Sequence, residues 1–471
     1  MRNSSPLQFD HCIPPTIPED VESNALGFFF LRYSFNHDVQ TTCSFFGILP
    51  AMYANSNMSF PLAKATTALA LQVARLHSWC GDESTTEHRV YTEALTQTNQ
   101  AIAGATQSKS DELLMTTLVL DAYESNRATF GREDDDSRFG THILGSVALL
   151  QHRGSLNYRD EVSWRLVIAT RNRLLYQNRN AFTESAGLEA VNAVWDGAVR
   201  TQPQGVAIEA DTLTFKLSRL QHLLETNRQT IFSQGEVDDK PIENSVEDEM
   251  ELGGILASAS NLAIECDLWR DALPPIWEPM PVLGCTLAPS IQAVALYDKV
   301  MPAVYTNLLI ANSLNRQRIT ELGVLALIQE CLVATSAKDA PRKSQSSMEP
   351  PAALLARAQL LVDEICASVP YLTVDVTDKV YATSPALPTP SRSVVCHWDT
   401  AEHRRQVIAS GLYMMYGTLD KAVSIVGDGG VLGGLGHAIL RDGQVDWMIE
   451  QSHRLRNVLR IVKDAYRAVN I

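Results

Sequence analysis

The sequence predicts an all-α protein, a single large superdomain of about twelve helices with no significant sheet. Three observations lead to this fold class. Apolar residues recur at spacings of three and four along most of the chain, which is typical of amphipathic helices. Strand alternation and hairpin turn sequences are both missing. The 471 residues are 45% hydrophobic and 20% charged, which is enough apolar material for a large core.

The first 24 residues are expected to form an irregular lead, because Pro14, Pro15 and Pro18 disfavour a helix. The helical domain then occupies residues 25–471, beginning with an aromatic helix at residues 28–33. The next helix shows one apolar stripe, formed by Leu62, Ala65, Leu69, Val73 and Leu76.

Local start signals place the following helices. Ser84-Thr85-Thr86-Glu87 reads as a capping box that opens a helix, residues 111–130 form another, and Asp160 caps a later one. Helical patterns also cover residues 185–198, 208–231, 246–269, 288–318, 320–337, 350–369, 397–427 and 444–469. Pro302 is expected to kink the fourth of these near Met301. Polar or glycine-rich composition predicts mobile loops at 234–251, 338–351 and 428–436.

The stretch from His142 to Gly154 is the most informative helix. Gly145 costs about 1 kcal/mol inside a helix, which predicts that another backbone packs closely there. Gly154 stands where a left-handed residue ends a helix. Arg153, in the last turn, is expected to complement the carbonyl end.

Charge and cysteine spacing exclude several functions. The net charge of -15 and the lack of any run of four basic residues argue against direct contact with nucleic acid. The eight cysteines include no pair closer than 19 residues, so a local zinc cluster cannot form. Scattered single cysteines are typical of reduced intracellular thiols. The longest apolar run near the N-terminus is too short to span a membrane, so a soluble protein without membrane contact is expected.

Other chemistry-bearing patterns favour structural roles. The glycine-rich residues 427–436 fit neither a dinucleotide fingerprint nor a P-loop, and read as a helix linker. The pairs His77/Cys80 and Cys396/His397 each supply half of a zinc site, and buried structural side chains are the favoured interpretation. Residues 134–136, three aspartates, are interpreted as a solvated loop.

Three further groups could carry function, although packing is favoured for each. Glu402-His403-Arg404-Arg405 opens a late helix and is expected to lie exposed. His142 and Arg153 lie near one helix face, where structural hydrogen bonds are expected. Residues 413–416, with Trp398, could line an adaptable apolar pocket, although core packing is the simpler expectation. We therefore assign no catalytic, cofactor-binding or metal-binding residues and expect no cofactor.

The spelling H-x-x-G-S-x-x-L-L-x-x-R-G over residues 142–154 resembles the signature helix of the fungal-specific transcription-factor regulatory domain. That domain is the helical region which follows the Zn2Cys6 DNA-binding cluster in many fungal regulators. Further stretches resemble the family in the same order from residue 25 onward, namely residues 25–80, 113–124, 301–310 (MPAVYTNLLI), 365–372 (ICASVPYL) and 412–416 (LYMMY).

The resemblance implies a regulator of transcription in a filamentous fungus, with secondary metabolism as a family-level expectation and the nucleus as its location. It would act through contacts with other proteins, such as a DNA-binding regulator or a second copy of itself, or by sensing a small molecule. The sequence departs from the family in lacking the zinc cluster, so the chain should not bind promoters by itself. The family offers no catalytic residues to transfer.

Two alternatives stay open at this point. An enzyme that reuses the helical fold, for example a cyclase or isomerase of a natural-product pathway, would draw on His397, Asp399, His403 and Tyr413. It would need a deep pocket in which two of these groups converge. The chain could also be an inert remnant or a fragment of a longer regulator.

Overall fold

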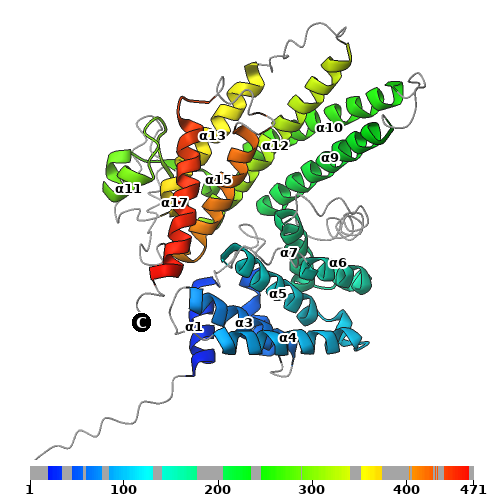
Figure 1. Cartoon of the computed structure of the whole chain (residues 1–471), viewed down its shortest axis with the longest axis vertical. Coiled ribbons are helices and arrows are strands. Elements are labelled where there is room, and N and C mark those ends of the chain that lie inside the picture. Colours follow the sequence, from blue (N-terminus) through cyan, green and yellow to red (C-terminus); the bar gives the residue numbers. More distant parts are fainter. Residues whose placement is uncertain are drawn as a thin grey trace, which may run out of the picture.

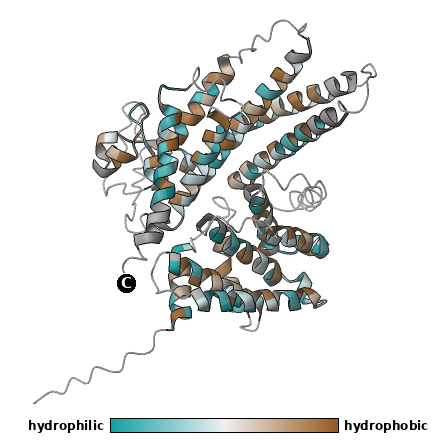
Figure 2. Cartoon of the chain, in the orientation of Figure 1, coloured by the Kyte–Doolittle hydropathy of each residue, from teal (hydrophilic) through white to brown (hydrophobic). Residues whose placement is uncertain are grey.

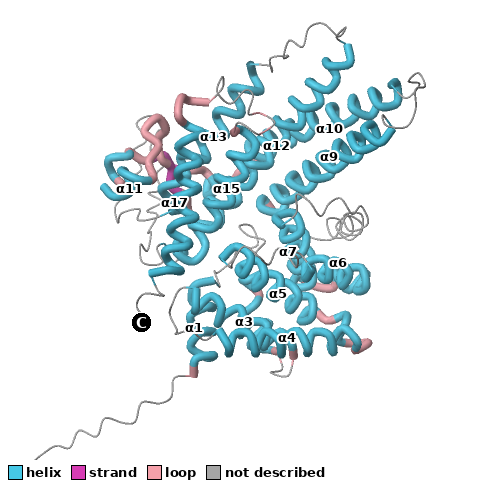
Figure 3. The backbone as a smooth tube through the Cα atoms, viewed as in Figure 1, coloured by secondary structure: helices cyan, strands magenta, loops and turns pink. Residues whose placement is uncertain are grey.

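The computed structural model confirms the all-α prediction. It describes residues 20–33, 45–56, 60–76, 84–130, 141–177, 205–234, 245–287, 289–339, 352–373, 403, 406–427, 430, 432 and 440–465. These residues form fourteen α-helices, two more than about twelve, and a sheet of two very short strands (Figures 1 and 3). Within the described part of the chain, no helix is both long and apolar enough to cross a bilayer.

Seven helices build the N-terminal half, shown in blue to teal in Figure 1: α1 (Val21–Tyr33), α2 (Leu49–Asn55), α3 (Pro61–Leu76), α4 (Ser84–Ala103), α5 (Asp111–Phe130), α6 (Thr141–Arg153) and α7 (Glu161–Gln177). Helix α3 lies at the centre and packs against α1, α4 and α5. Four members of its predicted stripe, Leu62, Ala65, Leu69 and Val73, are buried.

Seven more helices build the C-terminal half: α9 (Val206–Gln234), α10 (Ser245–Asp271), α11 (Pro289–Val294), α12 (Leu308–Asp339), α13 (Ala352–Thr373), α15 (Leu412–Val426) and α17 (Gln444–Ala465). Helix α12 packs against α9, α10, α13 and α15, and α17 lies on α15. Figure 2 shows hydrophobic and hydrophilic stretches alternating along the helices, as amphipathic packing requires.

The core consists of two hydrophobic clusters that meet at α9. One face of α9 places Ala210, Leu213 and Leu217 in the C-terminal cluster. Another face places Ile208 and Phe215 in the N-terminal cluster. Helix α9 therefore belongs to both halves.

The predicted continuous helix over residues 288–318 is wrong in its middle, over residues 295–307. Helix α11 ends at Val294, and strands β1 (Met280–Pro281) and β2 (Ala303–Val304) pair antiparallel where the kink was expected. Pro302 lacks an N–H, and its carbonyl instead accepts a hydrogen bond from Val282 (2.9 Å). Helix α12 begins after Asn307, whose side chain accepts hydrogen bonds from the backbone N–H groups of Leu309 (3.0 Å) and Ile310 (2.8 Å). It then runs without a break through the end of the predicted 288–318 segment and through the predicted 320–337 segment.

Of the other predictions from local sequence signals, some are confirmed and one is wrong. Asp160 caps α7 as predicted, accepting a hydrogen bond from the Ser163 backbone (2.9 Å). Gly154 is left-handed as predicted, with φ of 55°. The expectation for Gly145 is wrong, because a Cβ built there would meet nothing within 4 Å. Helix α4 does begin at Ser84.

Several predicted boundaries change or lie outside the described residues. Helix α1 begins at Val21, inside the expected irregular lead, and α10 begins at Ser245, inside the expected 234–251 loop. The predicted helix at 185–198, the 340–351 part of the second loop, and nearly all of the 428–436 loop fall outside the described part of the chain.

Candidate functional site

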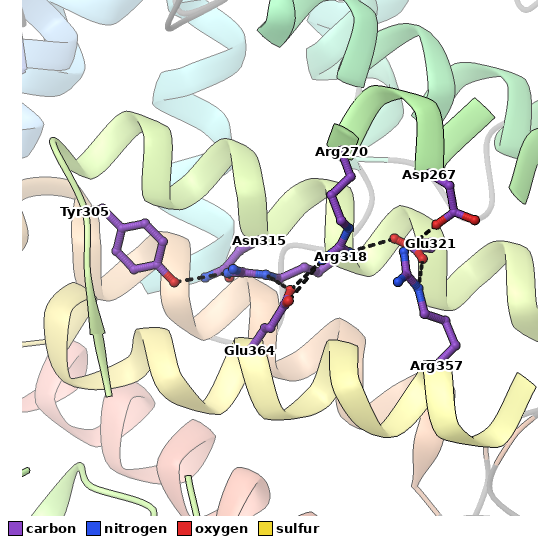
Figure 4. A network of polar contacts seen from close by, with 8 residues as sticks. All are labelled: Asp267, Arg270, Tyr305, Asn315, Arg318, Glu321, Arg357 and Glu364. Atoms are coloured by element: carbon purple, nitrogen blue, oxygen red, sulfur yellow. Dashed lines mark hydrogen bonds and ion pairs between the residues drawn. The ribbon is translucent and has the colours of Figure 1, made fainter. Parts of the chain in front are cut away.

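A network of charges, with Arg318 and Glu321 buried at its centre, joins three helices of the C-terminal half (Figure 4). Helix α10 contributes Asp267 and Arg270, and α13 contributes Arg357 and Glu364. Helix α12 lies between them and presents three side chains at a spacing of three, so that they share one face: Asn315, Arg318 and Glu321. Tyr305, which follows strand β2, completes the group.

Glu321 is the acceptor at one end of this ion network. Its side chain is 4% exposed and binds Arg270 at 2.9 Å and also Arg357. Arg357 in turn reaches Asp267 on α10, at 2.7 Å. Two arginines from different helices thus converge on one carboxylate of α12, which ties α10 and α13 to it.

Glu364 is the acceptor at the other end. Its two oxygens each lie 3.0 Å from Nη1 of Arg270, and one lies 2.9 Å from Nε of Arg318. Burial raises the pKa of Glu364, but the attraction of Arg318 and Arg270 outweighs it and leaves that pKa below its usual value. Both arginines therefore face a carboxylate that stays ionised.

Arg318 connects the ion network to a group of uncharged residues. Its Nη1 donates to Tyr305 Oη (3.2 Å) and to Asn315 Oδ1 (2.6 Å). Asn315 Nδ2 donates to Ser368 Oγ (2.8 Å), and that hydroxyl lies 3.8 Å from the sulfur of Met415. The rings of Tyr305 and Tyr371 are 5.2 Å apart. We call Tyr305, Asn315, Ser368, Tyr371 and Met415 the motif cluster; each is at most 1% exposed.

The motif cluster brings together three stretches on which the resemblance rests. Tyr305 belongs to residues 301–310, Ser368 and Tyr371 to 365–372, and Met415 to 412–416. These stretches are far apart in the chain, and their contacts involve side chains within the quoted patterns. Of residues 413–416, Met415 is fully buried in the core, whereas Tyr413, Met414 and Tyr416 are half-buried.

The signature helix also packs against another stretch of the resemblance. Ser146 Oγ donates to Thr117 (2.8 Å), and His142 Nε2 lies 3.1 Å from Glu124, so both contact α5. The prediction that Arg153 complements the carbonyl end of its own helix is wrong. It binds Asp111 at the start of α5 and donates to Asn157 (2.9 Å). The predicted structural roles of His142 and Arg153 are confirmed.

His403 is buried, which corrects its expected exposure. Its Nε2 lies 3.1 Å from the carbonyl oxygen of Tyr371, and the two rings are 4.5 Å apart. Burial lowers the pKa of His403, so the imidazole is neutral at neutral pH. Close packing continues at Gly411, where a Cβ would lie 2.8 Å from the carbonyl oxygen of Leu372. Of the other enzyme candidates, Tyr413 is half-buried on α15, and His397 and Asp399 lie outside the described residues.

The remaining predicted groups also lie outside the described residues. These are His77, Cys80, the aspartates 134–136, Cys396, Trp398, Glu402, Arg404 and Arg405. Where side chains are described, no three His, Cys, Asp or Glu residues are grouped so that they could hold a metal ion.

Sequence reasoning missed the ion network. The available signal was a set of charged residues spaced by three or seven on otherwise apolar helices, such as Arg318 and Glu321 on α12 or Arg357 and Glu364 on α13. Within the network, every arginine contacts a carboxylate and every carboxylate contacts an arginine. Such an arrangement fixes the register of the helices.

Comparison with known proteins gives no relative: no family model, no curated protein and no solved structure matches this chain.

Proposed function

We propose that this chain is a transcription-regulatory protein of a filamentous fungus that acts through contacts with other proteins. In this proposal it works in the nucleus, without a DNA-binding zinc cluster of its own, and modulates a DNA-binding regulator. Secondary metabolism is the class of pathway that the sequence resemblance favours. Sensing of a small molecule by the helical domain is compatible with the same role.

The observation that carries the proposal is the motif cluster. Three separate stretches that resemble the regulatory domain meet through Tyr305, Ser368, Tyr371 and Met415. The signature helix likewise meets the 113–124 stretch through Ser146 and Thr117. A chance likeness of short patterns would have no reason to pair them in space, so this pairing supports a common architecture.

The geometry favours a regulator over an enzyme. The charges in the C-terminal core bind one another, and His403, the one described histidine among the enzyme candidates, packs as a neutral ring against Tyr371. General acid–base catalysis needs such a group within hydrogen-bond reach of a substrate. His403 instead has its Nε2 beside a backbone carbonyl oxygen of the core.

Transcript profiling of a deletion strain, together with metabolite analysis of the same cultures, tests the proposal. We expect a coordinated loss or gain of one set of transcripts, restored by the intact gene. Unchanged transcripts with one accumulated precursor would contradict the proposal and indicate an enzyme.

A further inference from the structure

Helix α10 has two apolar faces, and only one of them is covered by the described part of the chain. The covered face belongs to the C-terminal core and consists of Leu252, Ile255, Ala259, Leu262, Cys266 and Trp269. The opposite face consists of Gly253, Ala257, Ser260, Ile264 and Leu268, which are all exposed. These residues are three or four positions apart, so they lie on one side of the helix. We call these five residues the exposed face of α10.

The exposed face is uncharged as well as apolar. No ionisable residue occurs between Leu252 and Ile264. Ile264 is 57% exposed and Leu268 is 62% exposed. Ser260 turns its hydroxyl back to the Leu256 carbonyl (2.8 Å), so this side chain makes its hydrogen bond within the helix. Two large apolar side chains that lie exposed one turn apart on an uncharged helix face indicate that another surface covers them.

The glycines leave room for a second helix on this surface. Gly253 and its neighbour Gly254 sit inside α10, where glycine disfavours the helix. A Cβ at either position would meet nothing within 4 Å, and neither has a positive φ. Nothing in the described chain therefore requires glycine here, whereas close approach of another backbone would.

The charges of α10 indicate which kind of partner helix fits this face. By its sequence α10 carries seven acidic residues and one basic residue: Glu247, Asp248, Glu249 and Glu251 precede the uncharged stretch, and Glu265, Asp267 and Asp271 follow it. Of the last three, Glu265 binds Lys216 and Asp267 binds Arg357 within the chain. A second copy would place acidic ends against acidic ends, in a chain whose net charge is already -15. A partner helix with an apolar middle and Lys or Arg at its ends is complementary to both features.

We propose that the exposed face of α10 is the docking site for a basic amphipathic helix of a partner protein. This inference extends the proposed function by naming the chemistry of the partner. From Gly253 to Leu268 the face is about 22 Å long, at 1.5 Å per residue, which accommodates about four turns of a partner helix. Ile264 and Leu268 would supply the apolar anchors. At the other end of the face, Gly253 would allow the backbone of the partner helix to approach closely.

The direct test uses a fluorescent synthetic helical peptide of 22 residues with a leucine and alanine face and lysines at both ends. Its control peptide carries glutamate in place of lysine. We expect the full chain to bind the basic peptide, and the variant Ile264→Asp/Leu268→Asp to bind it at least about tenfold more weakly by fluorescence anisotropy. Ile102→Asp on α4, which changes an equally exposed apolar residue (48%), should bind like the wild type.

Whether peptide affinity falls or rises in the aspartate variant distinguishes docking on the exposed face from attraction by charge alone. Two added aspartates make the surface more acidic, so attraction by charge alone would strengthen binding of the basic peptide. Gly253→Leu adds a second check, because it favours the helix and has room in the isolated chain. Its melting temperature should not fall, while peptide affinity should. Unchanged or stronger binding by both variants would overturn the proposal.

The same variants distinguish this inference from the proposed function. Light scattering that shows a wild-type dimer lost in Ile264→Asp/Leu268→Asp would assign the face to a second copy and overturn the basic-helix partner. In the deletion strain, full restoration of the transcripts by that variant would overturn the docking site while leaving the regulatory role intact. Transcripts unaltered by the deletion itself would contradict the regulatory role.

Discussion

Glu321 is the residue on which the ion network of α10, α12 and α13 depends. Its nearly buried carboxylate contacts Arg270 and Arg357, which come from the two flanking helices. A buried charge that loses its partner costs far more than an exposed pair contributes. Removing this carboxylate should therefore cost more than removing one partner of an exposed ion pair.

Glu321→Gln should lower the free energy of unfolding by about 1–3 kcal/mol, because Arg270 and Arg357, each 26% exposed, lose this charged partner and keep only Glu364 and Asp267. Urea unfolding of the full chain measures the change. The matched control is Glu265→Gln in the surface pair with Lys216, whose side chains are 42% and 47% exposed; its effect should stay within about 1 kcal/mol. Equal effects of the two substitutions would contradict the structural role of the network.

His403 predicts a pH dependence of stability. Burial lowers its folded pKa below the ordinary value of 6.5, so the unfolded chain binds a proton that the folded chain excludes. Stability from this group is therefore complete above about pH 6.5 and is lost as the pH falls toward the folded pKa. The lowered pKa of Glu364 acts in a separate window, since its contribution is lost only as the pH falls below 4.5.

We expect His403→Gln to flatten the dependence of the urea midpoint on pH between 7.5 and 5.5. The relevant quantity is the difference in slope between variant and wild type, because other groups contribute equally to both. A wild-type slope retained in the variant would show that His403 does not titrate on unfolding.

At the scale of the element, glycines inside helices have opposite roles that the sequence does not reveal. Gly145 in α6 has open space around it. A Cβ at Gly411, at the start of α15, would instead lie against the Leu372 carbonyl oxygen and 3.2 Å from a Leu308 methyl group. In the described chain the first glycine lowers helix stability without a packing contact, while the second allows two segments to approach closely.

Gly145→Ala should accordingly raise the free energy of unfolding by about 0.5–1 kcal/mol, through helix propensity and a smaller unfolded-state entropy. Gly411→Ala should lower it, because the added methyl meets backbone that cannot move away cheaply. Thermal melts of both variants, compared with the wild type, measure the two signs. A stabilising Gly411→Ala would mean that the contact between α13 and α15 is looser than the structure shows.

At the scale of the whole molecule, Asp211 on α9 is a polar link between the two halves. Its side chain is 4% exposed. One oxygen lies 2.6 Å from Arg316 of α12 and the other accepts a hydrogen bond from Asn172 of α7 (2.7 Å). Since α9 contributes side chains to both hydrophobic clusters, this carboxylate lies where the two cores join.

Asp211→Ala should destabilise the chain by about 3–5 kcal/mol, because the fully buried Arg171, 4.0 Å away, loses this carboxylate together with Arg316. It should also separate the unfolding of the two halves. Hydrogen exchange followed by mass spectrometry would then show different protection for peptides from α3 and α5 than for peptides from α12 and α13. Asp420→Ala, at an exposed position of α15, should change stability by less than about 0.5 kcal/mol. Uniform exchange in the Asp211 variant would contradict the linking role.

Local patterns in the sequence determined most of the helices, because amphipathic spacing and capping act within a few residues. The α3 stripe, the bounds of α5, the Asp160 cap and the left-handed Gly154 follow from such neighbours. The error at residues 288–318 shows the limit of this reasoning. There the strand pairing of Met280 with Val304 joins positions 24 residues apart, and it replaces a helix that the local pattern favoured.

Only the tertiary structure decided which polar residues enter the core and which apolar residues remain outside it. Arg270 and Glu364 meet across 94 residues of sequence, and His403 is buried through its contact with Tyr371. The exposed Ile264 and Leu268 look like core residues in the sequence. Burial depends on which helix faces pack together, and that pairing is set by contacts between distant segments and not by the periodicity of any single one.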